Sequence, residues 1–198
     1  MQITPAYVSE RLQSALGAAG RPPAPYAEID YTDESQLRCA AVLVPLLQMA
    51  GAWHLLYTRR TEWVESHKGQ VSFPGGACDT GETAAESTAL REAQEEVGID
   101  PSQVRILGRL TDLVTITSFR VTPVVGLIDW PTVFRLGENE VERVFTIPLE
   151  WLADTRNRWE FPLAGRNGTV IAYHPFDGEL LWGATARMTV NFLNVLGL

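Results

Sequence analysis

The chain has 198 residues, of which 45% are hydrophobic and 20% charged, and its net charge is −8. Such values are typical of one globular domain with a substantial core. The negative charge argues against nonspecific binding to nucleic acid or to a membrane surface, because both need a basic footprint. Cys39 and Cys78 are too few for a disulfide framework and indicate a reducing, cytoplasmic location. We expect Cys39 to be buried in a strand and Cys78 to have no role.

The first predicted element is an amphipathic helix over Ile3–Leu16. Its apolar residues recur at near-helical spacing, unlike the continuous apolar core of a signal peptide: Tyr7, Val8, Leu12 and Leu16. The Pro-rich segment 20–25 predicts an extended arm. The longest apolar run, Cys39–Leu47, contains Pro45 and is far too short to span a membrane. We therefore expect a helix and arm over residues 1–38 and one domain over residues 39–198.

The rest of the chain reads mainly as short strands. Ala40–Leu47 and Trp53–Arg59 predict a hairpin. Further strands are predicted at Gln70–Phe73, Val104–Leu110, Leu113–Thr117, Thr122–Ile128 and Val141–Pro148, with a late pair at Thr169–Pro175 and Glu179–Leu181. Short and terminal helices are predicted at Leu149–Asp154 and Gly183–Leu196. Many strands with helices at defined points imply an α+β fold, an α/β/α sandwich.

An acidic helix over Ala84–Val97 is the most informative segment. Thr83 and Glu86 form a candidate capping box at its start, and Gly98 stands where a left-handed C-terminal residue is expected. Three carboxylates lie at i, i+3 and i+4 on one face: Glu92, Glu95 and Glu96. Like charges at this spacing repel, and a hard divalent cation with oxygen ligands offsets that repulsion. A solvated acidic face is the alternative, which the nearby Gly75-Gly76 turn and Arg91 make less favourable.

These residues resemble the Nudix hydrolase signature, G-x5-E-x7-R-E-U-x-E-E-x-G-U, where U is aliphatic. Gly76 and Glu82 have the expected spacing, and Arg91–Ile99 matches the second half. One extra residue separates Glu82 from Arg91, as is frequent in the coenzyme A diphosphatase-like branch. Further segments look like that branch: Leu55–Arg60, His67–Gly76, Thr122–Gly126 and Leu181–Ala186.

The resemblance implies a Nudix-type α/β/α sandwich with a central mixed β-sheet and a metal-dependent pyrophosphatase. It assigns Mg²⁺ or Mn²⁺ to Glu92, Glu95, Glu96 and the carbonyl of Gly76. The general base is Glu95 or Glu140. Arg91 is expected to brace the acids and Glu82 to stabilise the loop before the helix. The expected phosphate-binding residues are Arg60, His67 and Lys68.

The favoured substrate class is a nucleoside diphosphate-linked small molecule, with coenzyme A or acyl-coenzyme A giving 3′,5′-ADP and 4′-phosphopantetheine. Glu65 stands where the branch carries a second basic residue. ADP-ribose, NADH or a nucleotide sugar is therefore the alternative within the enzyme class. A non-catalytic ligand-sensing Nudix domain is the alternative outside it, and a homodimer is left open.

Overall fold

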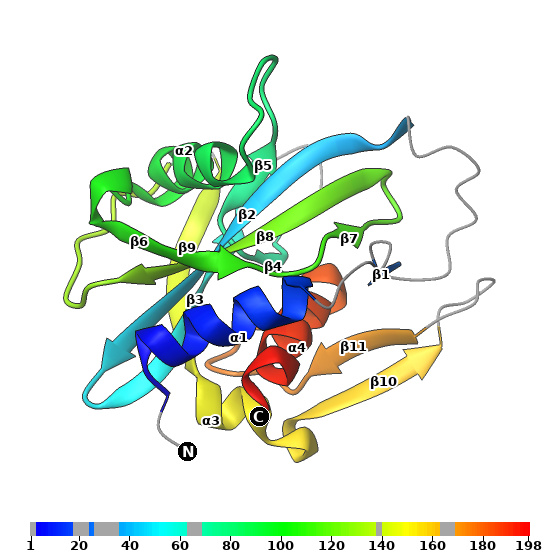
Figure 1. Cartoon of the computed structure of the whole chain (residues 1–198). Coiled ribbons are helices and arrows are strands. Elements are labelled where there is room, and N and C mark those ends of the chain that lie inside the picture. Colours follow the sequence, from blue (N-terminus) through cyan, green and yellow to red (C-terminus); the bar gives the residue numbers. More distant parts are fainter. Residues whose placement is uncertain (1–2, 18–23, 26–35, 63–68, 138–139, 163–168) are drawn as a thin grey trace.

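The computed structural model describes residues 3–17, 24–25, 36–62, 69–137, 140–162 and 169–198. Most of its strands form one mixed sheet, in the order β1-β7-β8-β2-β3-β4 (Figure 1). These strands are β1 (Ala24–Pro25), β2 (Arg38–Met49), β3 (Ala52–Arg60), β4 (Val71–Ser72), β7 (Leu113–Val114) and β8 (Phe119–Ile128). Three more join it: β5 (Gly75–Ala77) on β2, β6 (Val104–Arg109) on β8, and β9 (Val141–Pro148) on β3.

The sheet is mixed because its central strand has neighbours of both directions. β2 runs parallel to β8, from the pair Arg38–Phe119 to the pair Leu46–Leu127. It runs antiparallel to β3, through the tight turn at residues 50–51. β3 in turn runs antiparallel to β9. The expected hairpin and the mixed central sheet are therefore confirmed.

Alternate side chains of the central strands enter two separate cores. Leu43 and Val124 pack against α2 (Ala85–Val97), whereas Val44 and Val125 pack into the larger core under α1 (Pro5–Gly17) and α4 (Gly183–Leu196). Successive residues of a strand point to opposite faces, so the two cores lie on opposite sides of the sheet. This is the layered α+β sandwich that the sequence predicts.

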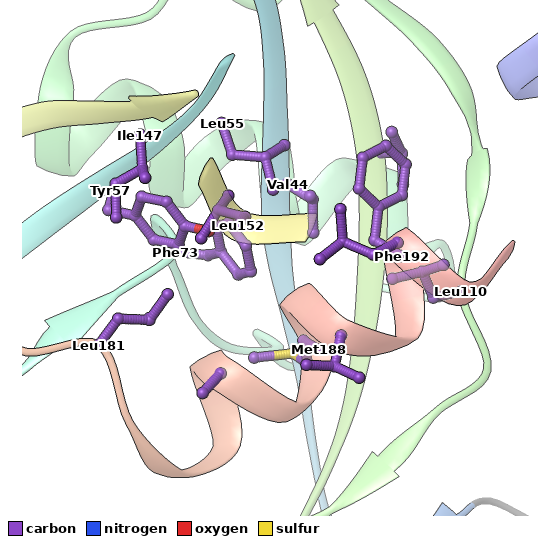
Figure 2. Close-up of a cluster of buried hydrophobic side chains, with 14 of the residues drawn as sticks. Val44, Leu55, Tyr57, Phe73, Leu110, Ile147, Leu152, Leu181, Met188 and Phe192 are labelled. Atoms are coloured by element: carbon purple, nitrogen blue, oxygen red, sulfur yellow. The ribbon is translucent and has the colours of Figure 1, made fainter. Parts of the chain in front are cut away.

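The larger core joins elements from both ends of the chain. In Figure 2, Tyr57 and Phe73 lie beside Leu152, with Met188 of α4 below them. The rings of Tyr57 and Phe73 stack with centroids 4.8 Å apart, and the Tyr57 hydroxyl hydrogen-bonds Thr189 Oγ1 at 3.0 Å. A buried phenol needs such a partner, and this one fixes α4 over β3.

The N-terminal helix packs directly into this core. Val8 and Leu12 of α1 are fully buried. The Tyr7 hydroxyl donates to the carbonyl of Leu196 at 2.9 Å, and Trp53 Nε1 donates to the carbonyl of Ile3 at 3.1 Å. In Figure 1, α1 (blue) and α4 (red) lie side by side. A division at residue 38 stays a prediction, but α1 shares the core of the residues that follow it.

Three local expectations are wrong. α2 begins after Ala84, one residue later than a cap at Thr83 requires, and alanine has no side-chain group that could cap the helix. Residues 179–181 do not form a strand. β11 (Thr169–Tyr173) pairs instead with β10 (Arg158–Pro162), in a region predicted to be irregular. The small helix α3 (Leu149–Ala153) and the terminal helix agree with the sequence.

The two cysteines also differ from expectation. Cys39 is exposed at the start of β2, and its sulfur is bonded to that of Cys78. The pairing of β5 with β2 brings the two residues together, and the N–H of Cys78 donates to the carbonyl of Cys39 at 3.0 Å. Neither residue is therefore a bystander. The disulfide ties the glycine-rich loop to the central strand.

In the part of the chain that the structure describes, no helix combines the length and apolar character needed to cross a bilayer.

Candidate active site

The glycine-rich loop is held against the central strand as a short strand of its own. In β5, Gly75 pairs with Val42 and Ala77 pairs with Ala40. The N–H of Leu43 donates to the carbonyl of Pro74 at 2.8 Å. These backbone hydrogen bonds hold the loop in place independently of the side chains of the site.

Helix α2 presents its acids because its other face is buried. Ala89, Ala93 and Val97 are fully buried against the sheet. Gly98 ends the helix with φ +70°, and its N–H donates to the carbonyl of Gln94 at 2.9 Å, as predicted. Glu92 and Glu96 reach the glycine-rich loop, and Glu96 also contacts Arg60 at the end of β3, whereas Glu95 contacts Arg91.

The three glutamates have different surroundings. Glu96 has only 2% of its side chain exposed and accepts hydrogen bonds from the Gly75 N–H and from Arg60 Nη1, both at 3.2 Å. Burial raises the pKa of Glu96 to about 7. Burial also raises the pKa of Glu92, against the opposing effect of Arg91. Glu95 is mostly exposed.

Arg91 links these acids to the loop. Its guanidinium donates to Glu92 at 2.9 Å, to Glu95 at 3.2 Å and to the carbonyl of Ala77 at 3.0 Å. It also binds Glu82 at 3.1 Å. A planar guanidinium has enough donors to hold several acceptors at once. Arg91 therefore contacts both the acids and the loop backbone, and its role as a brace stays a prediction.

Glu82 accepts hydrogen bonds from three residues of the loop–helix junction. Besides Arg91, it accepts from the N–H of Asp79 at 2.9 Å and from the hydroxyl of Thr88 at 2.7 Å. The hydrogen bonds from Arg91, followed by those from Asp79 and Thr88, lower the pKa of Glu82 to about 2. It is thus ionised at neutral pH and connects the loop to α2.

The loop that carries Glu140 is anchored between α2 and β3. The N–H of Gly137 donates to the carbonyl of Glu96 at 2.9 Å, and the carbonyl of Glu140 accepts from the N–H of Thr61 at 3.0 Å. The charge of Glu140 contributes to the raised pKa of both Glu92 and Glu96. The Glu140 side chain is exposed.

Of the expected phosphate-binding residues, Arg60 lies at the cluster, in contact with Glu96. His67 and Lys68 lie outside the described residues, as does Glu65. Sequence reasoning missed the Arg60–Glu96 contact, because the two residues come from different elements. It also missed the disulfide beside the loop, which depends on the pairing of β5 with β2.

The fit of a divalent cation depends on donor chemistry and on Gly76. Within the described residues, no three His, Cys, Asp or Glu side chains stand together as a ready-made metal-binding group. The acids are instead held by Arg60 and Arg91. Nevertheless the oxygen-only donors suit Mg²⁺ or Mn²⁺. A Cβ on Gly76 would lie 2.5 Å from the carboxyl carbon of Glu92, so only glycine lets loop backbone and carboxylate adjoin. The residues fit the cation.

The fold and the signature residues Gly76, Glu82 and Arg91–Ile99 point to one class of protein, and comparison with known proteins agrees. The NUDIX domain model matches residues 37–166. The chain belongs to the Nudix hydrolase family, whose members hydrolyse pyrophosphate bonds and generally use divalent metal ions.

Among its relatives is the uncharacterised Nudix hydrolase NudL of Pectobacterium atrosepticum. The two sequences are 43% identical over 159 residues, which cover 77% of this chain and 80% of the relative. NudL of Escherichia coli K12 is 46% identical over 112 residues, covering 57% of this chain and 58% of the relative. Neither name states a substrate.

Two solved structures share the fold. A MutT/Nudix family protein from Enterococcus faecalis superposes with a TM-score of 0.53 at 15% identity, covering 98% of this chain and 74% of that one. The Nudix hydrolase RenU from M. smegmatis gives a TM-score of 0.50 at 24% identity, covering 59% of this chain and 74% of that one.

Proposed function

We propose that this protein is a divalent-metal-dependent hydrolase of the pyrophosphate bond in a nucleoside diphosphate derivative. Coenzyme A or acyl-coenzyme A is the favoured substrate, giving 3′,5′-ADP and a 4′-phosphopantetheine product. The observation that carries the proposal is the meeting of two carboxylates, those of Glu92 and Glu96, with the Gly75–Gly76 backbone, while Arg91 holds Glu95 next to Glu92. A structural role alone would not bring like charges together there.

In this proposal Glu92, Glu95, Glu96 and the carbonyl of Gly76 hold Mg²⁺ or Mn²⁺. When bound, the cation would supply positive charge against the phosphoryl oxygens and make a water molecule more acidic. Arg91 keeps Glu92 and Glu95 oriented, and Glu82 keeps Arg91 in place through the contact at 3.1 Å. Because pyrophosphate hydrolysis depends on charge neutralisation and positioning, these braces contribute directly to the rate.

The proton of the attacking water goes to Glu95 or Glu140. The water oxygen forms a bond to one phosphorus while the bridging P–O bond breaks, and the leaving phosphate takes the electron pair. Glu95 is mostly exposed and touches Arg91, whereas Glu140 lies on a loop tied to both α2 and β3. Both are within reach of the acid cluster, and substitution to Gln distinguishes them. Arg60, His67 and Lys68 are assigned to the phosphates.

The coenzyme A assignment is supported by segments outside the signature. Residues 55–60 and 67–76 resemble the coenzyme A diphosphatase-like branch, and so do residues 181–186. In the structure these segments adjoin: Thr185 Oγ1 donates to the carbonyl of Val71 at 3.2 Å, beside the glycine-rich loop. Hydrolysis of ADP-ribose, NADH or a nucleotide sugar would use the same acids and glycine-rich loop and is the second candidate.

The test is product release from coenzyme A, acetyl-coenzyme A, ADP-ribose, NADH and UDP-glucose, each with Mg²⁺ or Mn²⁺. We expect coenzyme A derivatives to be hydrolysed fastest. Glu96→Gln should lower kcat/KM by at least about 100-fold, since it removes a charge from the metal site. Glu150→Gln is the matched control, because Glu150 is exposed on α3, away from the cluster.

The other outcomes separate the alternatives. Faster turnover of ADP-ribose or NADH would keep the pyrophosphatase and discard the coenzyme A assignment. Ligand binding without turnover of any substrate would support a sensing domain instead.

A further inference from the structure

The buried carboxylate of Glu96 is bound by an arginine from another element. Arg60 Nη1 lies 3.2 Å from Glu96 Oε1, while the other oxygen of Glu96 accepts the N–H of Gly75. The side chain of Arg60 is 24% exposed and that of Glu96 only 2%. Arg60 Nε is buried and makes no hydrogen bond among the described residues, so the arginine is incompletely satisfied in this position.

An irregularity in the sheet directs Arg60 to this place. β3 pairs with β9 through Arg59–Arg143 and then through Arg60–Val141, so that Glu142 is skipped. A bulge of this kind re-aims the side chains beside it. Arg59 contacts Glu142 at 3.2 Å and Glu179 at 3.6 Å, and the adjacent Arg60 contacts Glu96.

The contact between Arg60 and Glu96 balances the charge of a buried carboxylate. A buried carboxylate is costly unless a cation compensates it. Arg91 is already bound to Glu82, Glu92 and Glu95, whereas Arg60 is the cation in contact with Glu96 in the described part of the chain. A divalent cation on Glu96 would provide the same compensation, and it would repel a guanidinium only a few ångströms away.

We propose that Arg60 and the divalent cation compete for Glu96, and that Arg60, once displaced, pairs with an oxygen of the substrate's pyrophosphate. The inference rests on the proposed function and goes further, because it makes one positioning residue couple metal binding to phosphate binding. A guanidinium suits both acceptors, since it matches carboxylate and phosphate geometry equally well.

The first half is tested by Mn²⁺ binding to the substrate-free protein, measured by calorimetry. Arg60→Gln should bind Mn²⁺ about five-fold more tightly than the unmodified protein, because the competing charge is gone. Arg60→Lys, which keeps the charge, should stay within about two-fold of the unmodified protein. A residue that merely supported the fold would weaken metal binding when replaced, so the direction of change is diagnostic.

Arg59→Gln is the matched control. It removes the same charge from the neighbouring position of β3, where the partners are Glu62, Glu142 and Glu179, and should leave the Mn²⁺ affinity unchanged. Unchanged or weaker Mn²⁺ binding by Arg60→Gln, in protein that melts like the unmodified chain, would overturn the inference alone. If neither protein binds Mn²⁺, the inference and the proposed function both fail.

The second half is tested with imidodiphosphate, a pyrophosphate analogue that is not hydrolysed. In Mn²⁺-saturated protein, we expect Arg60→Gln to bind imidodiphosphate about ten-fold more weakly, the loss of one charge-assisted contact. Arg60→Lys should recover most of that affinity. Equal affinity of Arg60→Gln and the unmodified protein would show that displaced Arg60 does not reach the phosphate.

Discussion

At the residue scale, Gly76 lies directly beside the carboxylate of Glu92. An added Cβ would lie 2.5 Å from the carboxyl carbon of Glu92 and 2.6 Å from both of its oxygens. Gly76→Ala must therefore push Glu92 away from the loop. Because the clash is with the end of a flexible side chain that can shift, we expect no more than about 1 kcal/mol of lost stability and roughly ten-fold weaker Mn²⁺ binding, measured by urea denaturation and calorimetry.

Gly17 provides the control for that substitution. It ends α1, and an added Cβ there meets nothing within 4 Å. Gly17→Ala should cost no stability and leave Mn²⁺ binding unchanged. If Gly76→Ala bound Mn²⁺ as tightly as Gly17→Ala, the close approach of loop and carboxylate would have no part in the metal site.

At the scale of elements, Arg109 at the end of β6 is tied to Glu86 in the first turn of α2. The hydrogen bonds from Arg109 lower the pKa of Glu86 from its ordinary 4.5. The folded state then binds this proton more weakly than the unfolded chain. The ion pair therefore stabilises the folded state above pH 4.5, and this stabilisation is lost as the pH falls through the lowered pKa of Glu86.

Glu86→Gln should therefore destabilise the protein at pH 7 and lose its effect in acid. Both side chains are partly exposed, at 30% and 41%, so solvent screening limits the contribution to about 0.5 kcal/mol. Urea denaturation at pH 7 and at a pH below the lowered pKa of Glu86 measures the effect, with Glu150→Gln as control. A difference that persists unchanged below the lowered pKa of Glu86 would contradict the assignment to this ion pair.

The disulfide joins two other elements, β2 and the loop after β5. It closes a segment with a sequence separation of 39. A cross-link of this span stabilises by about 2–4 kcal/mol, by restricting the unfolded chain. Adding dithiothreitol should lower the melting temperature by roughly 5–15 °C. The Cys39→Ser/Cys78→Ser double variant should melt at the lower temperature with or without reductant, and equal melting of the unmodified protein in both conditions would contradict the prediction.

The elements that the sequence predicted correctly are those whose signals lie within one short stretch of residues. The periodicity of α2 and the stop at Gly98 are both contained in one stretch of sequence. The capping box failed because the N-cap is Ala84 and not Thr83, so neither Thr83 nor Glu86 stands at the position that the motif requires. β10 was missed because four of its five residues are exposed, which leaves no alternation to detect.

The candidate site divides in the same way. The three glutamates and Arg91 lie on one helix, so their common face follows from spacing alone. The burial of Glu96 and its contact with Arg60 depend on how β3, the loop and α2 meet. The disulfide likewise depends on the pairing of β5 with β2. No pattern in the sequence fixes such long-range contacts without the fold.

At the scale of the whole molecule, α1 covers one face of the sheet while α2 and its acids occupy the other. Leu12 of α1 is fully buried in the larger core, and an added Cβ on Gly108 of β6 would lie only 3.0 Å from Leu12 Cβ. Leu16, one turn further on, is 40% exposed. Substituting Leu12 and Leu16 in turn therefore distinguishes the contribution of a buried side chain of α1 from that of an exposed one.

Leu12→Ala should lower the free energy of unfolding by about 2–5 kcal/mol, because it leaves a cavity in a closely packed core. Leu16→Ala should change it by no more than about 0.5 kcal/mol. Urea denaturation measures both. Since the sheet separates this core from the acid cluster, folded Leu12→Ala should keep its Mn²⁺ affinity within about two-fold. Equal stability of the two variants would mean that α1 is dispensable and that the fold stands on residues 39–198 alone, whereas a selective loss in Leu12→Ala makes the N-terminal helix part of the cooperative unit that supports the site.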